Sequence, residues 1–375
     1  MSWPTAMIGD VCEIVSGATP KSGKPEYWDG DIAWATPKDL SDLGQKYLDD
    51  TPRKITRKGL DSCSAKMLPP RSVLLSSRAP IGLVAINTIP VCTNQGFKNL
   101  VPRNGAIDSD YLFWWLKCNN AHLQSLGRGA TFKEVSKAIV AGIQIPLPPL
   151  AEQKRIAGIL DAADALRAKR REALAQLDTL HQSTFLDMFG DPVTNPMGWE
   201  VRPLGELATN EDGKRVPVKK ADREAMDGEY PYYGASGIID YVNDYLFEGD
   251  RLLIGEDGAN LVARATPIAF IAKGKYWVNN HAHVLAFNGQ AELLFLEAFV
   301  NAIDLKPFLS GTAQPKLNQK KLNQIAIPTP PLELQRRFTA AVESVEQQKA
   351  RMRAHLTELD ALFASLQSRA FNGEL

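Results

Sequence analysis

The residues best suited to chemistry in this sequence are cations and amides gathered in short glycine-containing segments. One segment runs from Gly311 to Lys321 and holds three lysines and three side-chain amides. Lysine binds phosphate oxygens, whereas Asn and Gln amides can pair with the edges of bases. We expect this segment to contact DNA, and the alternative is a solvated loop that caps a helix. The predicted contact residues are Thr312, Gln314, Lys316 and Lys320.

A similar segment, residues 127–133, occurs in the first half of the sequence. It offers Arg128, Thr131 and Lys133, together with two glycines and a phenylalanine. The same two interpretations apply to it, DNA contact or a solvated loop. Because both halves of the chain contain such a segment, DNA contact gains support.

Further polar candidates flank predicted strands. Arg can pair with guanine, and Asn or Gln with adenine, when such residues lie on loop tips. Formation of a turn is the alternative for each of them. The candidates are Ser77, Arg78, Asn94 and Gln95 in the first half, and Tyr233, Ser236 and Asn260 in the second.

Two carboxylates, Glu256 and Asp257, lie among these candidates. A carboxylate near DNA repels phosphate. Each of the two would therefore have to accept a hydrogen bond from cytosine or organise a neighbouring cation.

Residue types that can bind a metal ion are present, but their spacing does not match that of a metal site. His281 and His283 alternate along a predicted strand, but no third ligand is evident, so we expect hydrogen-bonded structural histidines and no metal site. The cysteines form no CxxC pair, which favours reduced, partly buried thiols. They are Cys12, Cys63, Cys92 and Cys118.

Catalytic motifs are missing. The sequence has no Asn-Pro-Pro-Tyr-like methyltransferase motif, no GxxxxGK[ST] phosphate loop, no GxGxxG motif and no Ser-His-Asp arrangement. The segment Asn195–Gly198 comes nearest to the first motif but lacks its aromatic residue, so we interpret it as a linker. We predict no catalytic residue in this chain.

The elements that must position these residues form an internal repeat. Residues 145–150 and 327–332 share five of six residues, and the offset of 182 then continues along the chain. It relates Asp178 to Asp360, for example, and Gly129 to Gly311. The chain is therefore a tandem duplication with diverged front halves.

Each shared segment leads into a predicted long helix, the first from about Leu150 to Met188. Such a helix runs roughly 55–60 Å, enough to act as a spacer. Apolar residues at three- and four-residue steps predict that the two helices pair as an antiparallel coiled coil, although each could instead pack on its own domain. The predicted interface residues are Ile156, Ile159, Leu166, Leu177, Leu180, Phe338, Val345, Met352, Leu359 and Leu362. Polar interruptions are expected at Arg170, Gln348 and His355.

The front halves are rich in short apolar runs broken by Gly and Pro, which is typical of mostly-β domains. The predicted strands are residues 73–75, 83–86, 252–254 and 268–271. Residues 110–117 and 292–303 are predicted to be helical, with buried aromatic side chains. The expected fold class is α+β, with two mostly-β domains, two long antiparallel helices and an approximate two-fold symmetry.

Composition limits the choice of partners. The formal net charge is zero, but residues 1–149 carry +4 and residues 192–328 carry −3, so DNA contact must use local patches. No apolar stretch is long enough to cross a membrane, and the N-terminus does not resemble a signal peptide. We expect a cytoplasmic protein with no membrane association.

The arrangement resembles the specificity subunits of type I restriction-modification enzymes. The resemblance rests on the repeated Pro-Pro-Leu…Gln…Arg helix entry, the linker from Phe189 to Trp199, and the segments Tyr230–Gly237 and Ile254–Gly258. It spans essentially the whole chain. Each motif alone would be weak, and the order of domain, helix, domain, helix makes the resemblance specific.

The resemblance implies two target-recognition domains, residues 1–149 and 191–329, joined by helices at 150–190 and 330–375. It implies a chain that bridges two methyltransferase subunits and recruits motor-nuclease subunits on double-stranded DNA. S-adenosylmethionine, ATP and Mg²⁺ would belong to those partner subunits, with no cofactor in this chain. Because the front halves differ, an asymmetric bipartite target is expected, with half-sites roughly 34–36 Å apart.

Several alternatives remain open at this point. An orphan specificity protein would direct a methyltransferase without restriction. A structural coiled-coil adaptor would bind only proteins, and a hydrolase would use His281 and His283. The helices of two chains could also pair, which would give a homodimer in isolation.

Overall fold

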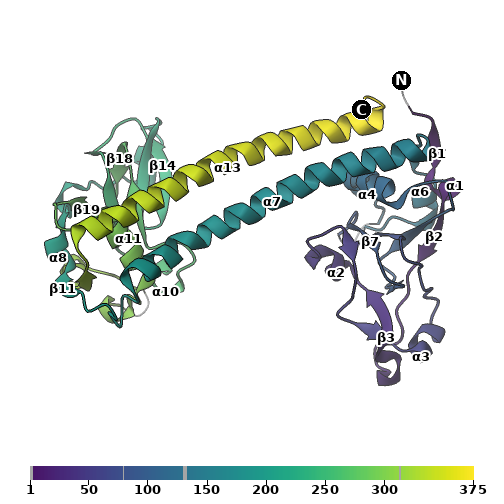
Figure 1. The fold of residues 1–375 in the computed structure, drawn as a ribbon, viewed down its shortest axis with the longest axis horizontal. Coiled ribbons are helices and arrows are strands. Elements are labelled where there is room, and N and C mark those ends of the chain that lie inside the picture. Colours follow the sequence, from purple (N-terminus) through teal and green to yellow (C-terminus); the bar gives the residue numbers. More distant parts are fainter. Residues whose placement is uncertain (1–2, 79, 130–132, 312–313) are drawn as a thin grey trace. The chain divides into compact units, whose positions relative to one another are not determined.

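The structure, a computed structural model, describes residues 3–78, 80–129, 133–311 and 314–375 (Figure 1). The chain forms two compact units. Unit 1 comprises Met1–Arg170 and His355–Leu375, and unit 2 comprises Arg171–Ala354. Two long helices, α7 (Leu150–Phe189) and α13 (Leu332–Asn372), each contribute one part to each unit.

Unit 1 is built on a five-stranded sheet with the order β2-β9-β6-β7-β4, a three-stranded sheet β5-β3-β8 and the pair β1-β10. In the larger sheet only β4 and β7 pair in parallel. The strands are β1 (Thr5–Met7), β2 (Cys12–Ser16), β3 (Trp28–Ala35), β4 (Tyr47–Leu48), β5 (Lys54–Ile55), β6 (Val73–Leu75), β7 (Val84–Asn87), β8 (Cys92–Thr93), β9 (Lys98–Pro102) and β10 (Gln144–Pro146). The helices are α1 (Ile8–Val11), α2 (Pro37–Asp42), α3 (Arg57–Asp61), α4 (Ser109–Cys118), α5 (Asn120–Ser125) and α6 (Lys137–Ala141).

Unit 2 contains two four-stranded sheets, β12-β19-β16-β17 and β14-β13-β18-β15, and the pair β11-β20. Its strands are β11 (Glu200–Pro203), β12 (Ala208–Asn210), β13 (Tyr230–Gly234), β14 (Gly237–Val242), β15 (Phe247–Glu248), β16 (Arg251–Gly255), β17 (Ala269–Ala272), β18 (Lys275–Val278), β19 (Ala282–Phe287) and β20 (Ala326–Thr329). Its helices are α8 (Leu204–Leu207), α9 (Lys220–Arg223), α10 (Asn260–Ala263), α11 (Leu293–Ala302) and α12 (Gln319–Asn323).

The predicted elements are confirmed. The four predicted strands correspond to β6, β7, β16 and β17, and the two predicted domain helices correspond to α4 and α11. The aromatic side chains expected in the cores are buried: Trp114, Trp115, Phe295 and Phe299. Both units also pair an early strand with the strand before their long helix, β1 with β10 and β11 with β20.

The glutamine of the repeated helix entry has a structural role in each unit. Gln153 is buried; its Oε1 accepts the backbone N–H of Asp108 at 2.8 Å, and its Nε2 donates to the carbonyl of Pro148 at 2.8 Å. Gln335 does the same with Glu292 and Pro330, at 2.9 and 2.8 Å. Since Asp108 and Glu292 precede α4 and α11, the glutamine ties the start of each domain helix to the start of a long helix.

The long helices run antiparallel within each unit (Figure 1). In unit 1, Arg167 of α7 bonds Asp360 of α13, and Arg170 Nη2 lies 2.8 Å from His355 Nδ1. Two of the three predicted polar interruptions, Arg170 and His355, therefore meet. In unit 2, Lys349 pairs with Asp178 at 2.7 Å.

The predicted interface needs three corrections. Leu166, Leu180 and Leu362 are 56%, 41% and 51% exposed, so they do not line the interface. Arg167 lies there in place of Leu166, with its guanidinium carbon 4.3 Å from the ring centre of Phe363. An arginine can bury its aliphatic stem in such an interface. The prediction chose the neighbouring Leu166 because Arg167 is polar. Of the other predicted residues, Ile156 and Phe338 are buried, and the partly buried ones are Ile159, Leu177, Val345, Met352 and Leu359.

The linker after α7 is fixed by its own side chains. Gly190 ends the helix with a positive φ of 78°, and Asp191 accepts the backbone N–H groups of Val193 and Thr194. The Asn195 side chain forms two hydrogen bonds with the backbone of Trp199, both at 2.9 Å. Among the described residues, no helix is long and apolar enough to cross a membrane.

Candidate nucleic-acid interface

Three loops meet in unit 1 at the end of β6. They are residues 76–78, residues 94–97 before β9, and a hairpin that is closed by Arg128 and Glu134. Ser77 donates its backbone N–H to Gly96 at 2.7 Å and accepts that of Val135 at 3.0 Å. Arg128 and Glu134 close the hairpin by two reciprocal backbone hydrogen bonds of 3.0 and 2.9 Å. We call these three loops, together with Lys98 at the start of β9, loop cluster 1.

Unit 2 has the same construction at the end of β16. Its loops are residues 256–257, residues 279–281 before β19, and the hairpin from Ser310 to Lys316. Glu256 donates its backbone N–H to His281 and accepts that of Leu317, both at 2.8 Å. Reciprocal backbone bonds of 2.8 Å join Ser310 and Lys316, which lie 182 residues after Arg128 and Glu134. These loops form loop cluster 2, together with Asp212 and Arg215, which bond to His283 and Glu256, and Lys320 in the helix α12 that follows the hairpin.

Local sequence explains these loops. Asn94 and Asn279 each turn the chain before a strand, because their Oδ1 atoms accept the N–H two residues on, at 2.9 and 2.8 Å. Ser136 and Asn318 then cap α6 and α12 after the hairpins. Gly311 has a φ of 79°, which a residue with a side chain rarely adopts.

In loop cluster 1 the central charge is Glu134. Its carboxylate accepts from Arg78 at 2.9 Å and from Lys98 at 3.0 Å. Burial raises the pKa of Glu134, but the hydrogen bonds from Lys98 and Arg78 outweigh burial and hold it below its usual range. The carboxylate is therefore charged at neutral pH.

In loop cluster 2 the central charge is Glu256. It accepts from Arg215 at 2.7 Å and from Lys316 at 3.1 Å. Burial raises the pKa of Glu256, and the bonds from Arg215 and Lys316 lower it further than burial raises it. Of the two roles that the sequence left for Glu256, the structure shows that it organises neighbouring cations.

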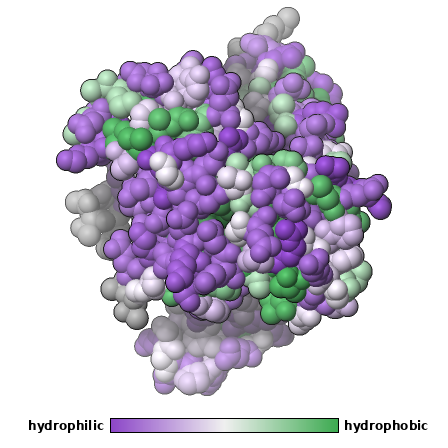
Figure 2. All heavy atoms as spheres, turned by 90° about the vertical axis from the view of Figure 1, so that its left-hand side faces the viewer, coloured by the Kyte–Doolittle hydropathy of each residue, from purple (hydrophilic) through white to green (hydrophobic). Residues whose placement is uncertain are grey.

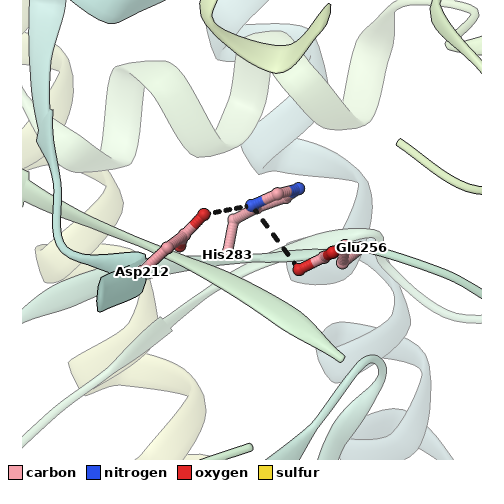
Figure 3. A group of neighbouring side chains, drawn as sticks. All are labelled: Asp212, Glu256 and His283. Atoms are coloured by element: carbon pink, nitrogen blue, oxygen red, sulfur yellow. Dashed lines mark hydrogen bonds and ion pairs between the residues drawn. The ribbon is translucent and has the colours of Figure 1, made fainter. Parts of the chain in front are cut away.

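His283 lies behind loop cluster 2 with two carboxylates (Figure 3). Its Nδ1 is 2.6 Å from Asp212 and 3.9 Å from Glu256, and its Nε2 is 2.7 Å from the carbonyl of Leu317. The bond to Leu317 ties the residue after the hairpin to β19. Burial raises the pKa of Asp212, but the interactions with His283, the backbone N–H of Val284 and Arg215 together lower it more, so that the net shift is downward.

The donor atoms of Asp212, Glu256 and His283 lie close enough to hold a metal ion. Arg215, however, bonds Glu256 and lies 3.5 Å from Asp212, so a guanidinium already balances both carboxylates. The arrangement fits an ion-pair network better than a cation site. The sequence missed the two carboxylates because they lie 71 and 27 positions before His283.

Most of the predicted contact residues reach the surface. Exposed side chains in or beside the clusters are Arg78, Gln95, Arg128, Lys133, Ser236, Gln314, Lys316 and Lys320. Asn94 is partly buried and forms the turn described above, and Asn260 bonds the backbone of Thr266. Thr131 and Thr312 lie outside the described residues.

Two predicted contacts have structural roles instead. Ser77 is buried, and its hydroxyl donates to the carbonyl of Gly96 at 3.1 Å, so it positions a loop. Tyr233 packs between Phe270 and Tyr276, with ring centres 5.8 and 5.5 Å away. Polarity at the end of a strand suggested both, but their side chains complete the fold.

Four charged residues of the two clusters were not predicted: Lys98, Glu134, Asp212 and Arg215. The repeat offered a signal for one of them, since Glu134 is the counterpart of Lys316. In the view of Figure 2 the described residues are mostly hydrophilic, and the hydrophobic ones among them form separate patches. Such a face suits polar contacts better than a large obligate apolar interface.

Comparison with known proteins gives a consistent family. A family model described as "Type I restriction modification DNA specificity domain" matches residues 2–176 and 196–360. The Methanocaldococcus jannaschii protein "Type I restriction enzyme MjaIX specificity subunit" is 28% identical over the whole chain and 93% of its own length. The Escherichia coli "Type I restriction enzyme EcoprrI specificity subunit" is 26% identical over 90% of the chain and 86% of its own length.

Solved structures show the same fold. The S subunit of a type I restriction-modification system from M. genitalium superposes with a TM-score of 0.63 at 16% identity, covering 99% of this chain and 96% of its own. A chain from a structure of type I complex assembly gives a TM-score of 0.62 at 19% identity, covering 100% and 98%.

Proposed function

The chain belongs to the type I restriction-modification DNA specificity family, and from that premise we propose that each unit reads one half of a split DNA target through its loop cluster. Recognition of DNA within a type I complex is the function of the chain. The contact residues that we propose are the exposed cations and amides of the two clusters.

The observation that carries this proposal is the repetition of the loop cluster. Both units bring three loops together at corresponding strand ends, although their sequences have diverged. Each cluster exposes cations, Arg78, Arg128 and Lys133 in one and Lys316 and Lys320 in the other. Cations on loops supply phosphate contacts, and amides and arginine supply base contacts.

An asymmetric target follows from the differences between the clusters. Arg78 of loop cluster 1 has the place that Asp257 has in loop cluster 2. Gln95 lies in the loop before β9, which corresponds to the loop with His281 before β19. These side chains present different donors and acceptors, so the half-sites should differ in sequence.

The partner subunits supply the chemistry in this proposal. Two methyltransferase subunits with S-adenosylmethionine would dock on the chain, and the long helices would serve as both spacer and docking site. Motor-nuclease subunits with ATP and Mg²⁺ would join that assembly in the cytoplasm. The orphan alternative has less support, because the matched relatives are named as subunits of restriction enzymes.

The test is to map methylated adenines by single-molecule sequencing in cells that carry the gene with its neighbours and in a deletion of this gene alone. We expect a split, asymmetric motif that disappears in the deletion. An identical methylation pattern in both strains would contradict the proposal and favour an adaptor that binds only proteins.

A further inference from the structure

The two loop clusters contain the same order of charges built from different residues. In loop cluster 1, Lys98 bonds Glu134, which bonds Arg78. In loop cluster 2, Arg215 bonds Glu256, which bonds Lys316. Each cluster thus has an inner cation, a central carboxylate and an outer cation.

Burial decreases in the same direction in both clusters. The inner side chains of Lys98 and Arg215 are only 9% and 13% exposed, whereas the outer side chains of Arg78 and Lys316 are 47% and 51% exposed. The outer cation therefore faces solvent, and the inner cation is held within the unit. His283 and Asp212 add further bonds on the inner side of loop cluster 2.

The carboxylate comes from a different loop in each unit. Glu134 ends the hairpin of loop cluster 1, and the residue at its place in the repeat is the outer cation Lys316. Glu256 follows a strand in loop cluster 2, at the place that Ser77 has in loop cluster 1. The hairpin therefore supplies the carboxylate in loop cluster 1 and the outer cation in loop cluster 2. The loop after the strand supplies the other group in each cluster.

A carboxylate at a DNA-binding surface has a cost, because it repels phosphate. The inner cation offsets that repulsion, and the carboxylate then limits the directions that the outer side chain can take. A cation that is already oriented loses less conformational entropy when it binds. Arg78 can also use one nitrogen for Glu134 and keep others for a base or phosphate.

We propose that Glu134 and Glu256 are positioning residues, each of which orients one outer cation, Arg78 or Lys316, toward the half-site that its own unit reads. The inference rests on the proposed function, since it assumes that the loop clusters face DNA. It adds that acidic residues inside each cluster increase specificity.

The test uses Glu134→Gln and Glu256→Gln in the assembled complex. Its probes are duplexes that carry the methylated motif of the wild type, with either half intact or scrambled. Removing a negative charge by itself would raise the affinity for all DNA. If the carboxylate positions the outer cation, binding to the intact motif should weaken instead. The preference for the correct half-site should then fall about tenfold, and only for the half that the altered unit reads. Affinity for fully scrambled DNA should stay the same or rise.

Matched controls are Glu13→Gln and Glu206→Gln, which change exposed glutamates that pair with Lys66 and Arg202 outside the clusters. We expect both to leave the half-site preferences unchanged. Thermal melting and gel filtration of each complex would separate loss of assembly from loss of preference. The two clusters are independent, so either variant tests the proposal if the other fails to assemble.

A double-variant cycle tests whether the carboxylate acts through the outer cation. We expect Glu134→Gln to have no further effect on half-site preference once Arg78→Ala is present. Unchanged preferences in both Gln variants, or effects that add fully to Arg78→Ala, would overturn the positioning role. A wild-type complex with no preference for either half-site would instead overturn the proposed function.

Discussion

Arg167 of α7 donates a hydrogen bond to Asp360 of α13 at 2.6 Å, and this pair recurs with the helices exchanged. The residues 182 positions away are Lys349 and Asp178, which pair at 2.7 Å. The duplication therefore includes the contacts between the long helices as well as the sequence motifs. Each unit carries one copy of this ion pair.

The Arg167 pair allows a first prediction about stability. We expect Arg167→Ala to lower the free energy of unfolding by roughly 1–2 kcal/mol, because it removes the stacking on Phe363 along with the ion pair. Asp360→Asn removes the ion pair and keeps the stacking, so its effect should be smaller. Urea unfolding followed by circular dichroism measures both, and equal losses would contradict the role of the stacking.

Gln153 and Gln335 give a second prediction. Replacing either by Leu leaves a backbone N–H and a carbonyl without their partner in a buried place, at a cost of roughly 2–4 kcal/mol. Gln176→Leu, at an exposed position of α7, is the matched control and should have little effect. Denaturant midpoints of the three variants check this, and equal midpoints for all would refute the role of the glutamines.

Glu297 should make stability depend on pH. It is largely buried in α11, where burial and the nearby Glu346 raise its pKa from 4.5 to about 7. The folded state then holds the proton more tightly than the unfolded state, so stability falls as the pH rises from about 4.5 to about 7. Glu297→Gln should remove this loss and stabilise the protein at pH 8 by roughly 1–3 kcal/mol.

Thermal or urea unfolding of wild type and Glu297→Gln at pH 5 and pH 8 gives the comparison. The two proteins should be close in stability at pH 5 and differ at pH 8. A variant that is less stable than wild type at pH 8 would contradict the assignment of Glu297 as a buried carboxyl with a raised pKa.

Arg128 and Lys320 are proposed to contact phosphate. Arg128→Ala and Lys320→Ala should each weaken binding of the assembled complex to all DNA sequences by a similar factor. Each should also reduce the slope of log affinity against log salt concentration by about 1. Titrations at several salt concentrations measure that slope, and a loss confined to one base of the motif would show that the residue reads sequence instead.

Much of the fold could be predicted because it depends on local patterns. The patterns that predict β6, β16 and the start of the helix at Leu150 each span only a few residues of the sequence. The repeat added the relationship between the units, since a single offset of 182 aligns both hairpins and both ion pairs.

The charge networks could not be predicted in the same way. Glu134 meets Lys98 from 36 positions away, and Arg215 meets Glu256 from 41 positions away. Such contacts depend on which loops the sheets bring together, and polarity alone does not reveal that. The same limit explains Ser77 and Leu166, where residue type suggested the wrong environment.

The central claim is that each unit reads its own half of the target. The most direct measurement is the methylated motif, mapped by single-molecule sequencing, of a complex in which residues 1–149 are replaced by the corresponding domain of another family member. We predict that one half of the motif changes and that the other half stays as in the wild type. A motif that stays the same in both halves, in a complex that still methylates DNA, would contradict the account.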